Sequence, residues 1–418
     1  MSTLIQVDAY LDTLNTIEKK KYNQKLKIIR ELYVQGPKTN SELCSDFRIS
    51  SPTSMGLLKE LIVEGLVEKQ GQGKSEGGRK PDLYGLRDNS LFVLSIALGR
   101  FKTRMAIFDN NNNNITRTHV FPVQISKDIN ILEQLYEYAE DLISASGIDR
   151  EKLLGIGLSM PGLVDAKEGS NHSYLLPPAG AESLQKLLSN KFNKPVYIQN
   201  DVKSIALAEY RFGLAQGRKN VLVVKLDWGI GLGILTDGKL NSGFTGFAGE
   251  IGHIPLVNDG ALCYCGKCGC LETVASGIAL TRMAKEGIQS GQYSLLNELS
   301  GGNIEKINPQ LVIDAANLGD QFAINILSEM GISLGKGISI LIQLLNPELI
   351  ILGGRMAEAK QYITTPIQQS INQYCMSQLR ERTEIVLSTL GLEADIMGPV
   401  AVVMENIFEG VLDVENND

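Results

Sequence analysis

The most constraining feature of this 418-residue chain is a group of four cysteines within eight residues: Cys263, Cys265, Cys268 and Cys270. One histidine, His253, precedes the group by ten residues. Structural zinc is held by four thiolate or imidazole groups in a closed tetrahedron. Four free thiols in so short a segment would be unusual, and a redox pair of Cys265 and Cys268 is disfavoured because two further thiols crowd it. The window therefore predicts a metal site, and its spacing leaves open which of the five groups is not a ligand.

Composition and the N-terminal sequence indicate the cellular compartment in which these thiols occur. The chain is 43% hydrophobic and 21% charged, as globular proteins are, and has no apolar run long enough to span a bilayer. At the N-terminus the positive cluster follows the apolar residues, the reverse of a secretory signal. We therefore expect a cytoplasmic protein that does not enter a membrane. Thiols stay reduced in the cytoplasm, which favours metal binding over disulfides.

The charge is unevenly distributed along the chain. Residues 19–87 hold fourteen Lys or Arg and eight Asp or Glu, a local net charge of +6, so the rest of the chain carries −13. Such a distribution indicates one module that meets an anionic partner and another that does not.

The basic segment shows three helical patterns followed by a glycine-rich hairpin, which predicts a winged helix-turn-helix over residues 1–90. In the third helix, Ser51 is the expected N-cap, Pro52 suits the first helical position, and Leu57, Leu58, Leu61 and Ile62 form the expected buried stripe. A protein-interaction module of three helices is the alternative, but the positive charge and the GGRKP segment favour DNA. The candidate DNA contacts are Ser51, Thr53, Ser54 and Lys59 on the third helix and Arg79 and Lys80 in the hairpin.

From about Leu91 the composition changes to strands that alternate with helical patterns, which predicts an α/β layer with a mostly parallel or mixed sheet. The strand pair around VLVVKL and IGLGILTDGKL is expected to end in a hairpin at Asp237-Gly238. A long helical pattern covers Gln321 to Leu345 and would suit either a core helix or a subunit interface.

The cysteine window also carries a family resemblance. The pattern H-x9-C-x-C-G-x-x-G-C-x-E, from His253 to Glu272, resembles the signature of the ROK family of repressors, open reading frames and sugar kinases. The resemblance covers roughly Leu91 to the C-terminus, and the helix-turn-helix ahead of it matches the repressor branch. Further matching pieces are MPGLVD (160–165), QNDVKSIALAE (199–209), GIGLGILTDGKL (229–240) and ILGG (351–354).

The resemblance implies an α/β chain in which the winged helix-turn-helix precedes a two-lobed actin-like (ribonuclease H-like) ATPase or sugar-kinase fold. Lobe 1 would comprise residues 91–200, completed by a C-terminal helix at about 391–413. Lobe 2 would comprise residues 201–390, with the zinc site and the helices of a dimer interface.

The resemblance further assigns site residues. It implies zinc held by His253, Cys263, Cys265 and Cys270, with Cys268 to spare. It implies sugar hydroxyls bound by Asn200, Asp201, Glu250, His253 and Glu272. This chemistry is reasonable in itself, because carboxylates and amides exchange hydrogen bonds with hydroxyls. If one nitrogen of His253 binds the metal, the other can face the sugar.

The segment expected to bind ATP departs from the kinase pattern. Kinases that the chain resembles carry D-x-G-G-T after the first strand, where this chain has ALGRFK, with Ala97 for the Asp, Arg100 for a Gly and Phe101 for the Thr. The second phosphate motif, DWGIGLG (227–233), has Asp-Trp in front of its glycines, which would then serve close packing between strands. Asp201 stands at the position of the kinase general base, although it can equally accept a hydrogen bond from a bound sugar.

The sequence therefore predicts a sugar-responsive DNA-binding regulator, a repressor of carbohydrate-use genes, without enzymatic activity. Its partners would be operator DNA and a sugar or sugar phosphate, and it would act as a homodimer or homotetramer. One alternative is an ATP-dependent sugar kinase of the ROK family with a DNA-binding head. The other is a regulator that docks onto proteins and needs no sugar.

Overall fold

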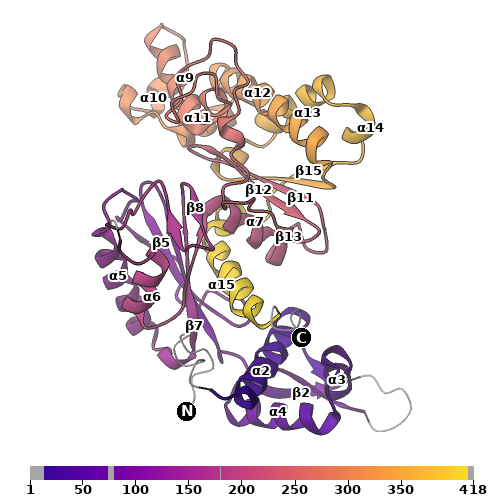
Figure 1. The fold of residues 1–418 in the computed structure, drawn as a ribbon. Coiled ribbons are helices and arrows are strands. Elements are labelled where there is room, and N and C mark those ends of the chain that lie inside the picture. Colours follow the sequence, from indigo (N-terminus) through magenta and orange to yellow (C-terminus); the bar gives the residue numbers. More distant parts are fainter. Residues whose placement is uncertain (1–13, 74–79, 179, 413–418) are drawn as a thin grey trace. The chain divides into compact units, whose positions relative to one another are not determined.

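The computed structural model describes residues 14–73, 80–178 and 180–412. The chain forms two compact units (Figure 1). One contains residues up to 200 together with those from 399 onward, and the other contains residues 201–398. Within the described residues, no helix combines the length and apolar character that crossing a membrane would require.

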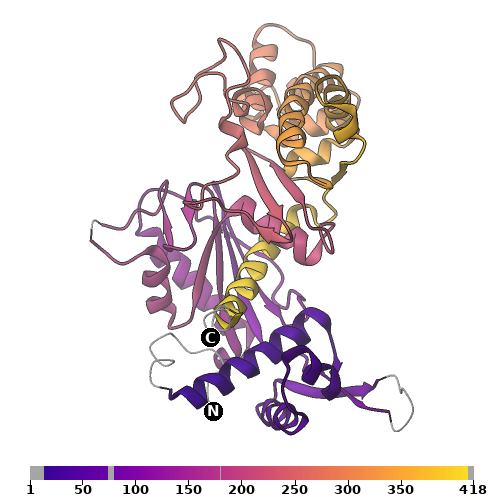
Figure 2. The same ribbon diagram turned by 45° about the vertical axis from the view of Figure 1, so that its right-hand side comes forward.

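The N-terminal part of the first unit is a winged helix-turn-helix, as the sequence predicts. Leucines from all three helices are buried, among them Leu32, Leu43 and Leu58. Strands β2 and β3 run side by side as the wing (Figure 2). The helices are α2 (Thr16–Gln35), α3 (Asn40–Phe47) and α4 (Ser51–Val63), and the sheet has the order β1 (Lys38–Thr39), β3 (Asp82–Leu86), β2 (Val67–Gln72).

The start of α4 differs from the prediction by one residue. Ser50, not Ser51, is the N-cap: its backbone is extended and its side chain accepts a hydrogen bond from the Thr53 amide. Pro52 is therefore the second helical residue. Ile62 was expected in the buried stripe but is 37% exposed. A shift of one residue at a helix start is easily missed because adjacent serines offer the same chemistry.

The rest of the first unit is built on a five-stranded sheet. The central strand β4 is antiparallel to β5, which is antiparallel to β6, and β4 is parallel to β7, which is parallel to β10. Helices α5 (Ile131–Ser146) and α6 (Leu184–Phe192) contribute to its buried apolar core. The strands are β4 (Phe92–Leu98), β5 (Thr103–Asp109), β6 (His119–Phe121), β7 (Leu153–Met160) and β10 (Val196–Asn200), with a short ribbon of β8 (Val164–Asp165) and β9 (Ser170–Asn171).

Helix α15 (Ala394–Leu412) packs against β7 of this sheet, and its residues from Pro399 onward belong to the first unit. The approach is close because β7 has glycine at the contact. A methyl group on Gly157 would lie 2.1 Å from the Pro399 carbonyl oxygen. Only glycine permits that spacing.

The second unit repeats the same strand arrangement, which identifies the two-lobed actin-like fold. Strand β11 is antiparallel to β12 and parallel to β14, with β13 and β15 at the two edges. The predicted hairpin turn is confirmed at Asp237 and Gly238, both of which have positive φ. The strands are β11 (Val221–Leu226), β12 (Ile230–Thr236), β13 (Lys239–Leu240), β14 (Leu349–Gly353) and β15 (Glu384–Leu387).

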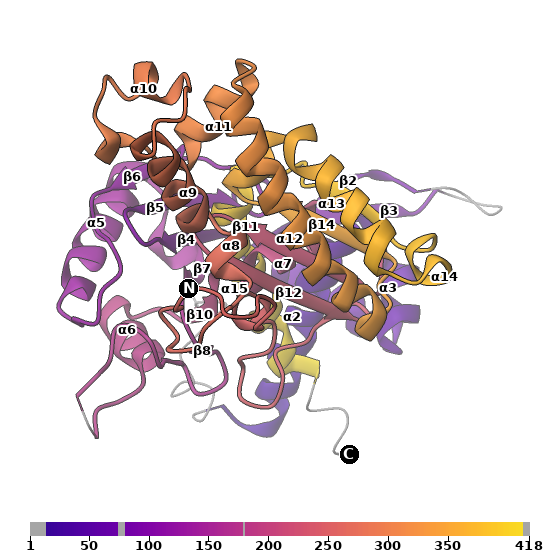
Figure 3. The ribbon, with the colours of Figure 1, turned by 90° about the horizontal axis from the view of Figure 1, so that it is seen from above.

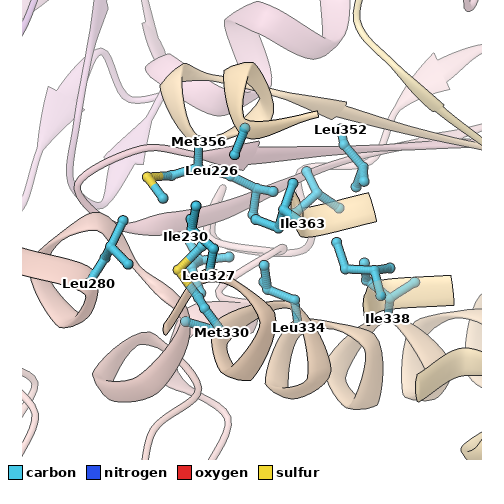
Figure 4. Close-up of a cluster of buried hydrophobic side chains, with 14 of the residues drawn as sticks. Leu226, Ile230, Leu280, Leu327, Met330, Leu334, Ile338, Leu352, Met356 and Ile363 are labelled. Atoms are coloured by element: carbon cyan, nitrogen blue, oxygen red, sulfur yellow. The ribbon is translucent and has the colours of Figure 1, made fainter. Parts of the chain in front are cut away.

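Helices α12 and α13 lie side by side in the second unit (Figure 3). The inner face of α12 packs into the core with Leu226, Ile230 and Met356 (Figure 4), so this stretch is largely a core helix. The helices of the unit are α7 (Asp201–Phe212), α8 (Glu272–Ala275), α9 (Gly277–Gln289), α10 (Leu296–Leu299), α11 (Pro309–Asn317), α12 (Gln321–Leu345), α13 (Gln361–Tyr374) and α14 (Ser377–Arg380).

Candidate metal centre and ligand-binding residues

The structure brings His253, Cys263, Cys265 and Cys270 together in the second unit, with one ligand atom of each within 4.8 Å of all the others. The Cys263 sulfur lies 3.6 Å from Nδ1 of His253, and the sulfurs of Cys265 and Cys270 lie 3.6 Å apart. Around a tetrahedral zinc ion, with Zn–S of about 2.3 Å, sulfurs lie about 3.8 Å apart. The four groups therefore form a cluster of a size that fits one metal ion.

Backbone hydrogen bonds shape the loop that carries these thiols. The Cys263 amide donates to the Lys267 carbonyl, which closes the turn, and Leu262 and Cys268 form an isolated β-bridge. Gly269 has positive φ, and a methyl group there would lie 2.0 Å from the Val257 carbonyl oxygen, so the position requires glycine. The side chain of Cys268 is exposed and lies outside the cluster.

The buried sulfurs of the cluster hold their protons tightly. Burial raises the pKa of the Cys270 thiol to about 12 and also raises the pKa of Cys263. A metal ion that binds here must therefore displace protons from sulfur, which makes its affinity dependent on pH.

Of the five residues expected to bind sugar, four lie in the second unit. Asp201 begins α7, Glu250 precedes the short turn 251–253, His253 is the last residue of that turn, and Glu272 begins α8. Burial raises the pKa of Glu250. The Glu250 carboxylate comes within 4.0 Å of Nε2 of His253.

Two of the five expected sugar ligands, Glu272 and Asn200, make internal hydrogen bonds through their side chains. Glu272 is only 6% exposed, and its Oε2 accepts a hydrogen bond from the Ile230 amide at 3.0 Å. Asn200 ends β10 in the first unit, and its side-chain amide donates to the Gly162 carbonyl. Each could bind a sugar only with its remaining hydrogen-bonding capacity.

Sequence reasoning missed Lys225, on β11. Its ammonium group lies 3.0 Å from Oδ2 of Asp201 and 3.0 Å from Oδ1 of Asp395. Burial alone would lower the pKa of Lys225, but the two carboxylates outweigh it and raise this pKa above its ordinary value. A single lysine in the otherwise apolar strand VLVVKL was the signal that could have revealed this cluster.

The glycines of the second phosphate motif pack against a helix instead of another strand. A methyl group on Gly231 would lie 2.4 Å from the Val202 side chain, and one on Gly233 would lie 2.5 Å from Cβ of Ala206, both on α7. Close packing is therefore confirmed, but the expected packing between strands is wrong, because the neighbour of these two glycines is helix α7. In this structure, the glycines serve close approach between β12 and α7.

The ALGRFK segment forms the tight turn between β4 and β5, closed by a hydrogen bond from the Gly99 amide to the Lys102 carbonyl. Ala97 is part of β4. The Phe101 side chain is 51% exposed, and the Arg100 guanidinium lies 5.8 Å from the centre of its ring. Two large side chains therefore stand at the turn where kinases of this fold would need glycine and threonine.

The candidate DNA contacts divide into three groups. Ser51, Thr53 and Lys59 on α4 are exposed, and so is Lys80, which lies between the wing strands β2 and β3. The prediction for Ser54 is wrong. Ser54 lies on the side of α4 that packs on the other helices and is 0% exposed, so its hydroxyl cannot reach DNA. Arg79 lies outside the described residues.

Comparison with known proteins decides the family. The sequence profile described as the ROK family matches residues 93–406. The chain belongs to the ROK family. It is 27% identical over 379 residues to the DNA-binding transcriptional dual regulator NagC of Escherichia coli K12, a match that covers 90% of this chain and 91% of NagC. A xylose repressor of Caldicellulosiruptor bescii is 29% identical, over 91% of this chain and 97% of the repressor.

Solved structures and enzymes of the family show the same likeness. The crystal structure of a ROK family transcriptional regulator, a homologue of the E. coli MLC protein, superposes with a TM-score of 0.79 at 26% identity, covering 94% of this chain and 99% of that one. A glucokinase of Thermotoga maritima is 32% identical over 64% of this chain and 84% of the enzyme. Regulators thus match along nearly the whole chain, whereas the kinase match covers about two thirds of it.

Proposed function

We propose that this ROK protein is a sugar-responsive transcriptional repressor of carbohydrate-use genes. The observation that carries the proposal is the winged helix-turn-helix in the same chain as the actin-like units, together with regulators that match both parts. Those regulators include an N-acetylglucosamine repressor and a xylose repressor, whose names state two different sugars. The effector of this chain would belong to the same chemical class, a sugar or sugar phosphate.

The metal centre would support the ligand site. His253, Cys263, Cys265 and Cys270 have the donor chemistry and the spacing for zinc. A bound zinc ion would supply structural cross-linking of the loop. With Nδ1 of His253 directed at the cluster, Nε2 points toward Glu250, where a sugar hydroxyl would bind. Asn200, Asp201 and Glu272 complete the proposed set of polar contacts.

Sugar phosphorylation is the alternative function, and the chain is less suited to it. Ala97 supplies no carboxylate for the metal of Mg-ATP, and Arg100 and Phe101 occupy the turn where backbone amides would bind phosphate. One oxygen of Asp201 is already bonded to Lys225. We therefore propose that Asp201 binds sugar without acting as a catalytic base.

The proposed mechanism is a shift of population between two arrangements of a homodimer or homotetramer in the cytoplasm. Two α4 helices would bind two half-sites of an operator, which requires a fixed spacing between the DNA-binding heads. A sugar that binds one arrangement better would change that spacing and release or strengthen the complex.

The test is selection of DNA sites from a random pool by the purified protein. The selection would be repeated with N-acetylglucosamine, D-xylose and D-glucose and with their phosphates. We expect a palindromic site whose enrichment changes with one of these compounds. Failure to enrich any palindrome would count against the proposal. ATP turnover with one of the sugars, lost in Asp201→Asn, would favour the kinase function instead. A palindrome that binds equally well with every compound would favour the regulator that needs no sugar.

A further inference from the structure

Tyr264 is placed unusually for an exposed aromatic residue. It lies between Cys263 and Cys265 in the loop that carries the clustered thiols, and it is 75% exposed. Its hydroxyl nevertheless lies 3.1 Å from Nε2 of His253, and the two rings meet edge to face with centroids 5.1 Å apart at 86°. Both nitrogens of His253 are therefore engaged, Nδ1 with the cysteine cluster and Nε2 with Tyr264.

The chemistry of the imidazole decides the direction of this hydrogen bond. A nitrogen that ligates a metal carries no proton, so with Nδ1 at the cluster the ring proton resides on Nε2. Nε2–H is then the donor and the Tyr264 hydroxyl oxygen is the acceptor. A sugar hydroxyl bound by His253 would have to accept a hydrogen bond from the same N–H, which makes only one good bond at a time.

The position of Glu250 shows what a sugar would gain over Tyr264. The Glu250 carboxylate lies 4.0 Å from Nε2 of His253, too far for a direct hydrogen bond. A sugar hydroxyl seated between them could accept from Nε2–H and donate to Glu250, which satisfies both groups. The Tyr264 ring is mostly in solvent already, so it can leave with little loss of packing.

We propose that Tyr264 is a built-in competitor of the sugar. In the sugar-free protein its hydroxyl occupies the Nε2–H of His253, and the sugar displaces it on binding. Tyr264 thereby sets how much sugar is needed for a response and selects ligands whose hydroxyl can bridge His253 and Glu250. This inference rests on the proposed sugar-binding function.

The decisive variant is Tyr264→Phe, which removes the competing hydroxyl and keeps the ring. The full-length, zinc-loaded protein would be titrated calorimetrically with N-acetylglucosamine, D-xylose and D-glucose. For the sugar that binds the wild-type protein best, we expect the Kd to fall by about 2- to 10-fold, the range that corresponds to losing one competing hydrogen bond. Tyr293→Phe, at a 96% exposed position in the same unit, is the matched control and should leave the Kd unchanged.

An unchanged or weaker affinity of Tyr264→Phe, with wild-type zinc content, would overturn the competition while leaving the sugar-binding function intact. If the wild-type protein binds none of the sugars, the proposed function fails, and this inference fails with it. A second readout tests the hydrogen bond itself. The chain has only three histidines, so His119→Gln with His172→Asn leaves His253 as the sole imidazole. We expect its ¹⁵Nε2 resonance to shift in Tyr264→Phe, and no shift would overturn the proposal.

Discussion

The ammonium group of Lys225 lies 3.0 Å from the carboxylate of Asp201, the first residue of helix α7. The same ammonium lies 3.0 Å from Asp395, the second residue of helix α15. The Lys225 side chain, which is only 13% exposed, thus joins the first turns of two helices. The farther of its two partners, Asp395, lies 170 residues away in the sequence. Carboxylates in a first helical turn also suit the helix dipole. Asp201 is therefore held in place by charge as well as by its backbone.

Replacement of Lys225 by methionine should destabilise the protein by about 3–5 kcal/mol, because two partly buried carboxylates would lose their common counterion. Denaturant unfolding of the full chain measures this change. Adding Asp395→Asn to Lys225→Met should recover part of the loss, since it removes one of the uncompensated charges. A loss below about 1 kcal/mol for Lys225→Met would show that the cluster behaves like an exposed ion pair.

Metal content should separate two neighbouring cysteines. Cys265→Ser removes one of the four clustered ligands, so we expect the purified variant to lose its zinc and its response to sugar together. Cys268→Ser is the matched control, because that thiol is exposed and outside the cluster. Elemental analysis of zinc per chain gives the result. Equal zinc in both variants, or a loss confined to Cys268→Ser, would contradict the proposed ligand set.

Two glutamates of the second unit should show opposite pH dependence. Burial raises the pKa of Glu209, so the folded state favours its protonated form and stability is lost as the pH rises from the unfolded pKa, about 4.3, through the higher folded pKa. The amides of Asn220 and Lys219 lower the pKa of Glu348. The stability that Glu348 contributes is therefore present above about pH 4.3 and is lost as the pH falls through the lower folded pKa.

The corresponding variants are Glu209→Gln and Glu348→Gln, compared with the wild type by thermal unfolding between about pH 3.5 and pH 7. With rising pH, the Tm of Glu209→Gln should increase relative to the wild type. The Tm of Glu348→Gln should decrease relative to the wild type. These slopes do not depend on what each substitution costs in hydrogen bonds at a fixed pH. Parallel slopes for the two variants would show that the environments of these carboxyl groups differ from those described.

The proposed orientation of α4 on DNA can be tested with two substitutions five residues apart on this helix. Lys59 is exposed, so Lys59→Ala should weaken operator binding and reduce the salt dependence, measured as the slope of log K against log salt, by about 0.9. Ser54→Ala should leave DNA affinity unchanged, because Ser54 is buried. It should also be neutral or mildly stabilising, since the Ser54 hydroxyl has no hydrogen-bond partner within the described residues. Fluorescence anisotropy at several salt concentrations measures both variants. A loss of affinity in Ser54→Ala larger than that in Lys59→Ala would contradict this orientation of α4.

Much of the molecule could be predicted because its determinants are local. The clustered thiols lie within eight residues, and the winged helix-turn-helix follows from helical periodicity and turn residues. The hairpin at Asp237-Gly238 needs only two residues with positive φ. The cysteine window and the further motifs indicate the family, and neither requires knowledge of contacts between distant strands.

The sequence by itself determined the class of fold, the group of candidate metal ligands and the presence of a winged helix-turn-helix, since each is indicated by residues close together in the chain. Only the tertiary structure decided which side chains face each other across long separations. It placed Lys225 between two distant carboxylates, turned Ser54 inward and set Tyr264 against His253. The physical reason is that burial and pairing depend on how helices and strands pack, and neither periodicity nor spacing carries that information.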